Sequence, residues 1–390
     1  MPEWLDLPDD ERAILAVVDD FVGTRVRPRV REFEPDDRYP EPLIEQMKEL
    51  GCFGLMIPPE YGGTGVSTAC LAMVTESLAR GWMSLAGAIG GHSVMSYLVR
   101  EFGTQEQKSR WLPGMAEGSL RVTMALTEPS GGSDLQAMRT VARPDGDGFA
   151  LNGQKTWISN ARHSSRLGVL CRSDPDASPA YRGMSILMVA QQDGVSVGRN
   201  LPKLGYKGVE ACEVTFDDVH VPLEDVVGGA PGHGWQQMMR SLEVGRVQVA
   251  ARALGVAQAA LDAALDYSQQ RETFGKPIWQ HQAVGDHLAN MATRIQAARL
   301  LTRDAAHRLD SGQRADLEAG MAKLFASEVA KDAAFDAMRV HGAYGYSREY
   351  DVERLYRDAP LMVIGEGTNE IQRQVITRQL IQRHPLGTGR

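Results

Sequence analysis

One carboxylate in the last part of the chain is presented by its neighbours in a way that suits chemistry. Glu366 stands between two glycines in Ile364-Gly-Glu-Gly-Thr-Asn-Glu370, just before a predicted helix. Flanking glycines allow the backbone to lie close to a ligand while a single carboxylate, a potential general base, faces it. By itself, however, a glutamate on a surface loop is the more common interpretation.

Two further segments carry hydrogen-bonding groups suited to a ligand with phosphates. Thr127-Glu-Pro-Ser-Gly-Gly-Ser-Asp134 concentrates hydroxyls, glycines and free backbone amides, which can approach a flat ligand closely. In Arg271-Glu-Thr-Phe-Gly-Lys-Pro-Ile278, Arg271 and Thr273 offer a fork of donors and a hydroxyl that fit a pyrophosphate. In isolation, the first segment is equally well a connecting loop, and the second is better explained as a basic helix end that complements the dipole.

The sequence lacks the motifs that several other functions require. No glycine run completes G-x-G-x-x-G between a strand and a helix, so a nicotinamide fold is rejected. The nine histidines form no H-E-x-x-H pair and no Cys-His cluster, and G-x-S-x-G is absent, so neither a metal site nor a serine hydrolase is expected. The formal net charge of −8 argues against nucleic acid as the main partner, because phosphate binding requires a basic face.

The cysteines and the start of the chain predict where the protein works. Cys52, Cys70, Cys171 and Cys212 are far apart and form no C-x-x-C pair, which favours a reducing compartment. The acidic first ten residues carry no targeting pattern, and no stretch approaches the eighteen apolar residues of a membrane span. A cytoplasmic protein without a membrane span is expected.

The elements that position these residues fall into three predicted domains. Residues 1–121 show apolar residues three and four positions apart and a capping-box pattern at Thr104 and Gln107, typical of an α-helical domain. Residues 122–232 contain short strands separated by tight turns, including one at Asn152-Gly153, and predict an antiparallel β-barrel or sandwich. Residues 233–390 are helical and Ala-rich, and predict a four-helix bundle. The fold class is therefore α+β.

Six motifs in this order resemble the acyl-CoA dehydrogenase family, a family of flavoproteins, over nearly the whole chain. Their spacing is similar to that of the family, and they make a non-catalytic helical scaffold improbable. They are Ala125-Leu-Thr-Glu-Pro-Ser-Gly-Gly-Ser-Asp134, Lys155-Thr-Trp-Ile-Ser-Asn160, Arg271-Glu-Thr-Phe-Gly-Lys276, His281-Gln282, Gly342-Ala-Tyr-Gly-Tyr346 and Glu366-Gly-Thr-Asn-Glu370.

The resemblance implies FAD as cofactor and an acyl-CoA as substrate. It places the flavin between the β-domain and the bundle, with the pyrophosphate and adenosine held partly by a neighbouring subunit of a homotetramer, a dimer of dimers. The cofactor residues that it implies are Leu126, Thr127, Ser133, Trp157, Ile158, Ser159, Arg271, Thr273, Gln282, Arg339, Gly342, Ala343, Thr368 and Glu370. The substrate residues are Ser133, Glu243, Arg246 and Gly367.

The resemblance also implies the reaction, a step of fatty acid β-oxidation. Glu366 would remove the α-proton while the β-hydride passes to flavin N5, giving a trans-2-enoyl-CoA. The Glu366 amide and a flavin ribityl hydroxyl would hold the thioester oxygen, an effect worth about 3–4 kcal/mol per donor. An electron-transfer flavoprotein is the expected electron acceptor.

Three departures from the family pattern bear on substrate. Gly245 stands where some branched- and long-chain members carry their base, which leaves the role to Glu366. Gly365 replaces a bulky Tyr of straight-chain members, as in the loop of the isovaleryl-CoA dehydrogenase member, so we expect a branched or bulky acyl group. Arg339 replaces a common Gln near the adenosine. An acyl carrier protein thioester dehydrogenase, or a flavin oxidase or monooxygenase of the same fold, stays open as an alternative.

Overall fold

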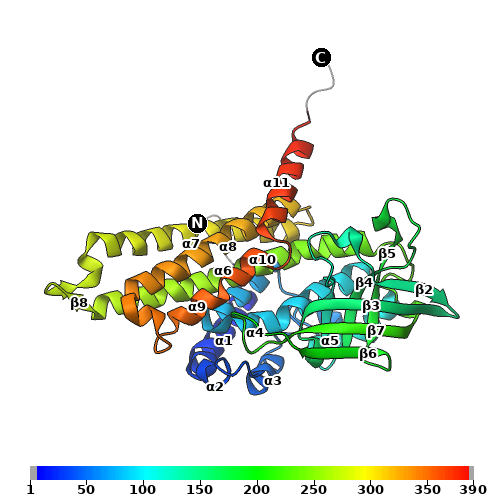
Figure 1. Cartoon of the computed structure of the whole chain (residues 1–390), viewed down its shortest axis with the longest axis horizontal. Coiled ribbons are helices and arrows are strands. Elements are labelled where there is room, and N and C mark those ends of the chain that lie inside the picture. The colour runs from blue at the N-terminus through cyan, green and yellow to red at the C-terminus, as the bar shows by residue number, and fades with distance from the viewer. Residues whose placement is uncertain (1–6, 386–390) are drawn as a thin grey trace, which may run out of the picture.

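The computed structural model describes residues 7–385. Residues 1–6 and 386–390, the outer ends of the first and last expected domains, lie outside the described residues, and so does most of the acidic start. The fold has the three expected parts: helices, then a curled sheet, then helices (Figure 1).

The N-terminal part is helical and is dominated by one long helix. This helix, α4, bends at Trp82 (φ −159°, ψ 116°). The capping box at Thr104 and Gln107 is confirmed at the start of the last helix. The helices are α1 (Asp9–Phe21), α2 (Val30–Phe33), α3 (Glu41–Glu49), α4 (Thr68–Phe102) and α5 (Gln105–Glu117).

The central part is a single seven-stranded sheet in the order β1-β4-β2-β3-β7-β6, with β5 paired to β4. The strands are β1 (Val122–Ala125), β2 (Val141–Asp145), β3 (Gly148–Ser159), β4 (Arg166–Arg172), β5 (Met184–Ala190), β6 (Val195–Asn200) and β7 (Ala211–Pro222).

Two expectations for this sheet need correction. Most pairings are antiparallel, but β1 and β2 each pair with β4 in parallel, because the loop after β1 carries the chain across to β2 instead of turning it back. The turn predicted at Asn152-Gly153 is wrong. β3 continues through these residues with a shift of register against β7, since a glycine at φ 149° accommodates a bulge inside the strand.

The C-terminal part contains three long helices that pack together and against α4. These are α6 (Gly234–Gln270), α7 (Gln282–Asp310) and α8 (Asp316–His341), and the short hairpin of β8 (Glu272–Thr273) and β9 (Lys276–Pro277) joins the first two. α9 (Val352–Asp358), α10 (Pro360–Ile364) and α11 (Asn369–Arg383) follow.

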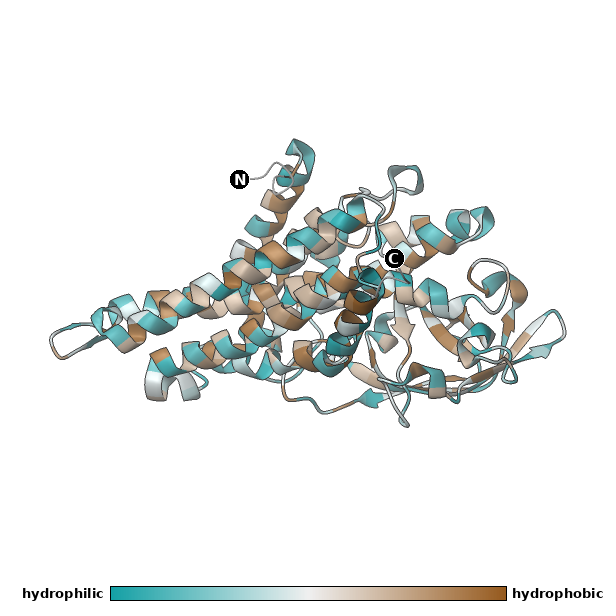
Figure 2. Cartoon of the chain, turned by 90° about the horizontal axis from the view of Figure 1, so that it is seen from above, coloured by the Kyte–Doolittle hydropathy of each residue, from teal (hydrophilic) through white to brown (hydrophobic). Residues whose placement is uncertain are grey.

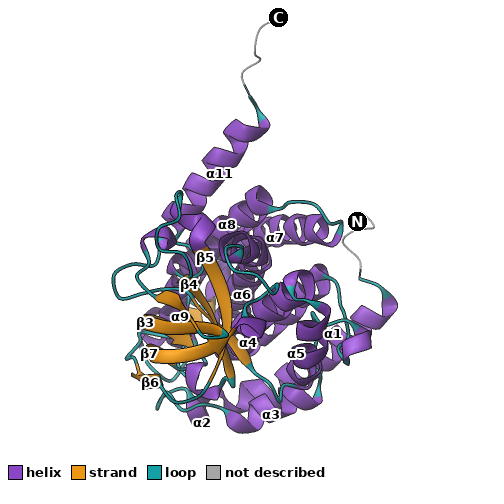
Figure 3. Cartoon of the chain, turned by 90° about the vertical axis from the view of Figure 1, so that its right-hand side faces the viewer, coloured by secondary structure: helices purple, strands orange, loops and turns teal. Residues whose placement is uncertain are grey.

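The expected fourth bundle helix, α11, does not lie alongside the other three. Its start packs on α8, and the helix projects from the body of the molecule (Figure 1 and Figure 3), with the Arg383 side chain reaching back to Glu318 of α8. Only Asn369 and Gln372 are buried in it, whereas Leu380 and Ile381 are 47% and 69% exposed. α4 takes the fourth place against α6 instead.

The whole chain is elongated, with the β8–β9 hairpin at one end and the sheet at the other (Figure 1 and Figure 2). The largest core cluster joins α4 to the C-terminal helices, and two smaller clusters lie around and within the sheet. None of the helices in residues 7–385 is long and apolar enough to cross a membrane.

Candidate active site

Glu366 lies in the loop between α10 and α11 and points at the middle of α6. Its backbone adopts the left-handed region (φ 52°), which is unusual for a residue with a side chain. Its Oε2 atom is buried and has no hydrogen-bond partner among the described residues. A Cβ added at Gly245 would lie 2.3 Å from this oxygen. The carboxylate can therefore occupy its position only because Gly245 has no side chain.

The environment of Glu366 makes its carboxylate a stronger base. Burial raises its pKa above the ordinary value of 4.5, because the charged form loses hydration. The positive charges of Arg252, Lys323 and Arg246 act in the opposite direction without cancelling the effect of burial. A raised pKa brings the carboxyl closer to the range in which a general base works near neutral pH.

A buried lysine holds the loop that carries Glu366. Lys323 on α8 is fully buried, and its Nζ donates to the carbonyls of Val363 (3.2 Å) and Gly367 (2.9 Å) on either side of Glu366. It also donates to Oδ1 of Asn369 at 2.9 Å. Sequence analysis missed Lys323, although a lysine within the apolar stretch Met321-Ala-Lys-Leu-Phe-Ala326 was a signal for a buried, bonded cation.

The same loop offers a free donor to a ligand. The backbone amide of Glu366 donates to no partner among the described residues. Its carbonyl accepts a hydrogen bond from Gln372 Nε2 at 3.4 Å, which orients the peptide on its C-terminal side. An amide without a partner next to a buried carboxylate is suited to bind the oxygen of a carbonyl whose neighbouring carbon loses a proton.

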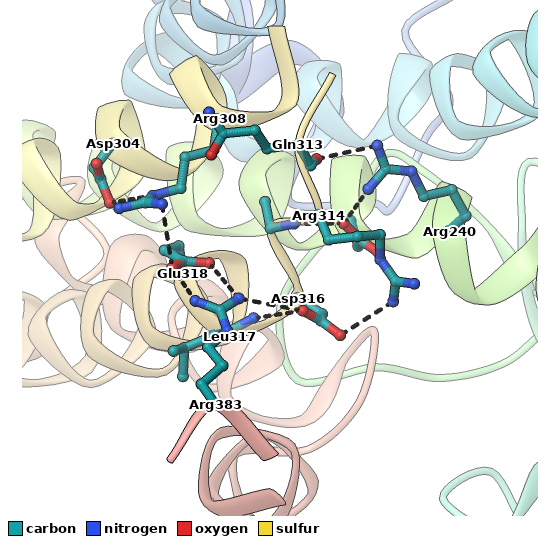
Figure 4. Close-up of polar contacts among 11 residues, drawn as sticks. Arg240, Asp304, Arg308, Gln313, Arg314, Asp316, Leu317, Glu318 and Arg383 are labelled. Carbon is teal, nitrogen blue, oxygen red and sulfur yellow. Dashed lines mark hydrogen bonds and ion pairs between the residues drawn. The ribbon is translucent and has the colours of Figure 1, made fainter. Parts of the chain in front are cut away.

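The expected substrate residues on α6 differ in how free they are. Glu243 is fully buried, and its oxygens accept hydrogen bonds from Arg240 (2.6 Å), Arg314 (2.9 Å) and the amide of Ala315 (2.9 Å). It thus anchors the turn between α7 and α8, where Arg240 also donates to the carbonyl of Gln313 at 3.1 Å (Figure 4). Arg246 is 8% exposed, and its Nε is buried without a partner.

The network of Figure 4 also fixes α11. Arg383 donates to Glu318 at 2.6 Å and lies 3.7 Å from Asp316, both in the first turn of α8. Arg308 on α7 lies 3.6 Å from Glu318. The Glu366 loop is therefore held by Lys323 at its own position and by the Arg383 contacts at the far end of the helix that follows it.

On the sheet side, the structure brings the expected flavin residues of two segments together. The amide of Thr156 donates to the carbonyl of Thr127 at 2.9 Å, which joins β3 to the loop after β1. Trp157 has a positive φ of 60° and is 57% exposed, although Ile158 next to it is buried. The strand is bulged here, so an indole faces outward where a flat ligand can lie against it.

Two hydroxyls in the loop after β1 have no hydrogen-bond partner among residues 7–385. Those of Thr127 and Ser133 make no hydrogen bond to a described residue, and Ser133 is exposed. Leu126 and Ser159 are half-buried. On the other side, Thr368 caps α11 by accepting from Ile371 at 3.3 Å, and Glu370 in the first turn is exposed.

The remaining expected cofactor residues lie at the opposite end of the molecule. Arg271 and Thr273 belong to the β8–β9 hairpin, far from the sheet (Figure 1). Tyr267 and His341 stack at 4.2 Å and bring the end of α8 to the same place. Exposed cofactor residues at this end are Arg271, Gln282, Arg339, Gly342 and Ala343. One chain therefore does not bring the two expected halves of a flavin site together.

Family comparison agrees with the three-part fold. The N-terminal, middle and C-terminal domain models of the acyl-CoA dehydrogenase family match residues 8–119, 123–219 and 232–381. The chain belongs to the acyl-CoA dehydrogenase family, whose members are oxidoreductases and flavoproteins.

Individual relatives cover the chain almost completely. It is 40% identical over 372 residues to the (2S)-methylsuccinyl-CoA dehydrogenase of Cereibacter sphaeroides, covering 93% of this chain and 68% of the relative. The butyryl-CoA dehydrogenase of Megasphaera elsdenii has a similar structure, with a TM-score of 0.93, 34% identity and coverage of 96% and 99%. A chain from the solved structure of the electron transferring flavoprotein of Acidaminococcus fermentans gives a TM-score of 0.94, 35% identity and coverage of 97% and 99%.

Proposed function

We propose that this protein is an FAD-dependent acyl-CoA dehydrogenase in which Glu366 removes the α-proton of a branched or bulky acyl thioester, giving the trans-2-enoyl-CoA. The observation that carries the proposal is the Oε2 atom of Glu366, which is buried and unpaired against Gly245. Because no described hydrogen-bond donor stabilises this buried carboxylate, its protonated form is favoured relative to its charged form.

The residues of the chain divide the work around this carboxylate. The free amide of Glu366 binds the thioester oxygen and stabilises the negative charge that develops there as the proton leaves. Lys323 holds the loop so that the amide and the carboxylate face the same substrate. Gly367 and Arg246 bind the thioester near the reacting carbons. When bound, FAD supplies the acceptor for the β-hydride.

We place FAD between the sheet segment of one copy and the hairpin end of another. Trp157, Thr127 and Ser133 offer an exposed ring and free hydroxyls, which fit a flavin and its ribityl chain. Arg271 and Thr273 offer donors that fit a pyrophosphate. Because these groups lie at opposite ends of one chain, two copies complete each site, and a tetramer of paired dimers is the assembly that we propose. Electrons leave to an electron-transfer flavoprotein.

The acyl group is inferred from the loop before the base. Gly365 has ordinary backbone angles (φ −69°, ψ 153°), so its backbone does not require a glycine. A Cβ added there would approach only Leu361 within 4 Å. The missing side chain thus leaves room for a wider acyl group. The relative from Cereibacter sphaeroides is named for a methyl-branched acyl group, which supports this inference.

The direct test is anaerobic reduction of the flavin in the purified holoenzyme. We expect branched acyl-CoAs to bleach the flavin fastest among straight, branched and aromatic thioesters, with slow reoxidation in air. Glu366→Gln should lower the reduction rate by at least about 10²-fold, since the general base is lost. Full activity of Glu366→Gln would refute the role of this residue. Rapid reoxidation of the flavin by oxygen would instead support an oxidase. Flavin reduction only by acyl carrier protein thioesters would mean that the substrate is carried by acyl carrier protein and not by coenzyme A.

A further inference from the structure

A second arginine on α6 lies beside Glu366 and forms no ion pair with a described carboxylate. Arg252 is 7% exposed, and its Nε is buried without a hydrogen-bond partner. Among the described residues, no carboxylate lies within ion-pair distance of it and no acceptor binds its guanidinium. Among the other buried arginines, Arg354 lies 3.6 Å from Asp351, whereas Arg246, whose Nε also lacks a partner, is already assigned to the thioester. An unpaired buried cation is costly, so its retention points to an anion that the chain itself does not provide.

The surroundings of Arg252 hold its guanidinium in place between two helices. A Cβ added at Gly90 on α4 would lie 2.6 Å from its Nη2, so the guanidinium packs directly on the α4 backbone. The ring of Tyr206 lies 5.8 Å away in cation–π geometry. Tyr206 is itself fixed, because its amide donates to Asp358 at 2.6 Å. The guanidinium is thus positioned in advance, which favours recognition of a defined ligand group.

The spacing on α6 relates Arg252 to the reacting carbons. Gly245, which contacts Glu366, and Arg252 are seven residues apart, so they share a helix face and are separated by about 10 Å along the axis. Long side chains on a helix point back toward its N-terminus, which directs Arg252 toward Gly245. Arg252 is also the cation with the largest electrostatic effect on Glu366. A group bound by Arg252 is therefore only a few carbons from the α-carbon that Glu366 attacks.

We propose that Arg252 binds a free carboxylate at the far end of the acyl group, so that the substrates are coenzyme A monothioesters of short, branched dicarboxylic acids. This inference rests on the proposed dehydrogenase function. It also explains the charge balance, because Glu366 becomes neutral as it takes the proton, and a substrate carboxylate then continues to compensate Arg252. The proposal assigns a specificity role to Arg252 and leaves the proton transfer to Glu366.

The test compares two thioesters of nearly equal shape in the wild-type holoenzyme. In 2-methylsuccinyl-CoA the acyl group ends in a carboxylate, and in 2,4-dimethylpentanoyl-CoA an isopropyl group takes its place. We expect the rate of anaerobic flavin reduction at low thioester concentration to be about 10- to 100-fold higher with the carboxylate, the range for a charge-assisted hydrogen bond. Equal rates, or a preference for the isopropyl compound, would overturn the proposal. If neither thioester nor any other reduces the flavin, the proposed function itself fails.

Variants separate carboxylate binding from a simple counter-ion role for Glu366. Arg252→Met should weaken reduction by the carboxylate thioester about 10- to 100-fold and abolish or reverse the preference, and Arg252→Lys should restore part of it. If Arg252→Met lowers the rate of flavin reduction equally with both thioesters, Arg252 acts only as a counter-ion of Glu366, and the proposal is refuted. Arg294→Met, which removes an arginine of the surface pair with Asp332 on another face, is the matched control. Binding of 2-methylsuccinyl-CoA to Glu366→Gln, followed by flavin absorbance, should show the same dependence on Arg252 without turnover.

Discussion

The carboxylate of Glu366 owes its place to a side chain that is missing on another helix. A carboxylate beside Gly245, with an added Cβ only 2.3 Å from Oε2, leaves no room for even one methyl group. The sequence motif predicted Glu366 as the base and Gly245 as the position without a competing base. What it could not show is that the two positions touch, since they are 121 residues apart and only packing brings them together.

Gly245→Ala is expected to displace the carboxylate without damaging the helix. Alanine favours helix more than glycine does, so the free energy of unfolding should not fall through helix propensity. The methyl group forces Oε2 to move, and a displacement of about 1 Å can lower a rate about 10²-fold. Stopped-flow flavin reduction measures this effect. Gly23→Ala, where an added Cβ meets nothing within 4 Å, is the control and should keep the wild-type rate.

Glu366 and Lys323 should shape the pH dependence from opposite sides. Flavin reduction rises as Glu366 ionises, at a pH above the ordinary 4.5 because burial raises its pKa. Burial lowers the pKa of Lys323 to about 8, so above that pH the loop loses the charged donor that holds it. We expect a bell-shaped profile with an alkaline limb near pH 8. In Lys323→Met, the maximum should fall and the alkaline limb should disappear, whereas Lys48→Met should leave the profile unchanged.

The stability of the chain should change in the opposite direction over the same alkaline range. Between pH 8 and the ordinary value of 10.5, Lys323 is neutral in the folded chain and still protonated in the unfolded chain. The unfolded chain then binds more protons, so the free energy of unfolding contributed by this group rises with pH. Denaturant titrations at pH 7.5 and 10 of the wild type and of Lys323→Met measure the difference. If the free energy of unfolding of the wild type falls more steeply from pH 7.5 to pH 10 than that of Lys323→Met, the lowered pKa of Lys323 is contradicted.

At the scale of elements, the sequence predicted which segments are helices and strands better than it predicted how those elements pack against one another. The succession of helices, strands and helices is confirmed, because hydrophobic periodicity and turn residues are local signals. The failures are all tertiary. The bulge at Gly153, the parallel pairings to β4 and the projection of α11 depend on which neighbour each element meets, and no short stretch of sequence carries that information. The domain boundaries proposed at 121 and 232 stay predictions.

A buried ion pair ties the expected flavin loop to the sheet and gives a prediction for this element. Lys155 of β3 is fully buried and donates to the carbonyl of Leu126 at 2.9 Å and to Glu128 at 3.0 Å. Glu128 in turn accepts from the amides of Arg139 (2.7 Å) and Thr140 (2.9 Å), which closes the loop at its far end. We expect Lys155→Met to cost about 3–5 kcal/mol of stability, because a charge remains buried without its partner.

The double variant distinguishes the two roles of this pair. Lys155→Met with Glu128→Gln removes the uncompensated charge, so it should regain part of the lost stability in denaturant titrations. FAD affinity, measured by flavin fluorescence, should stay weakened by about tenfold or more, since the loop is no longer held. If the double variant binds FAD as the wild type does, the pair serves the fold and not the cofactor loop.

At the scale of the whole molecule, the expected cofactor residues lie at both ends of an elongated chain. Exposed apolar side chains include Phe274, 96% exposed, in the hairpin at one end, and Ile381, 69% exposed, on α11, which projects from the side of the molecule (Figure 1). Apolar groups so exposed favour contact with another copy. The single-chain sequence could name these residues through the family resemblance, but it could not show that one chain leaves them apart.

Co-expression of two inactive variants tests whether sites are shared between copies. Glu366→Gln lacks the base, and Arg271→Ala lacks the pyrophosphate donor. In a twofold dimer with shared sites, a mixed pair contains one site with both residues intact and one site with neither. Random pairing should therefore restore about one quarter of the wild-type activity, since half of the pairs are mixed and each has one intact site of two. Sites built within single chains would give no recovery.

The left-handed backbone of Glu366 has a consequence for heat resistance. An L-residue in this conformation costs about 1–2 kcal/mol, and the unpaired buried carboxylate, whose pKa is raised, adds a further cost at every pH above 4.5. Glycine at this position would remove both of these costs to the stability of the fold. Selecting variants of this chain only for a higher melting temperature would therefore favour catalytically inactive ones. Engineering for thermal stability must measure turnover at the same time.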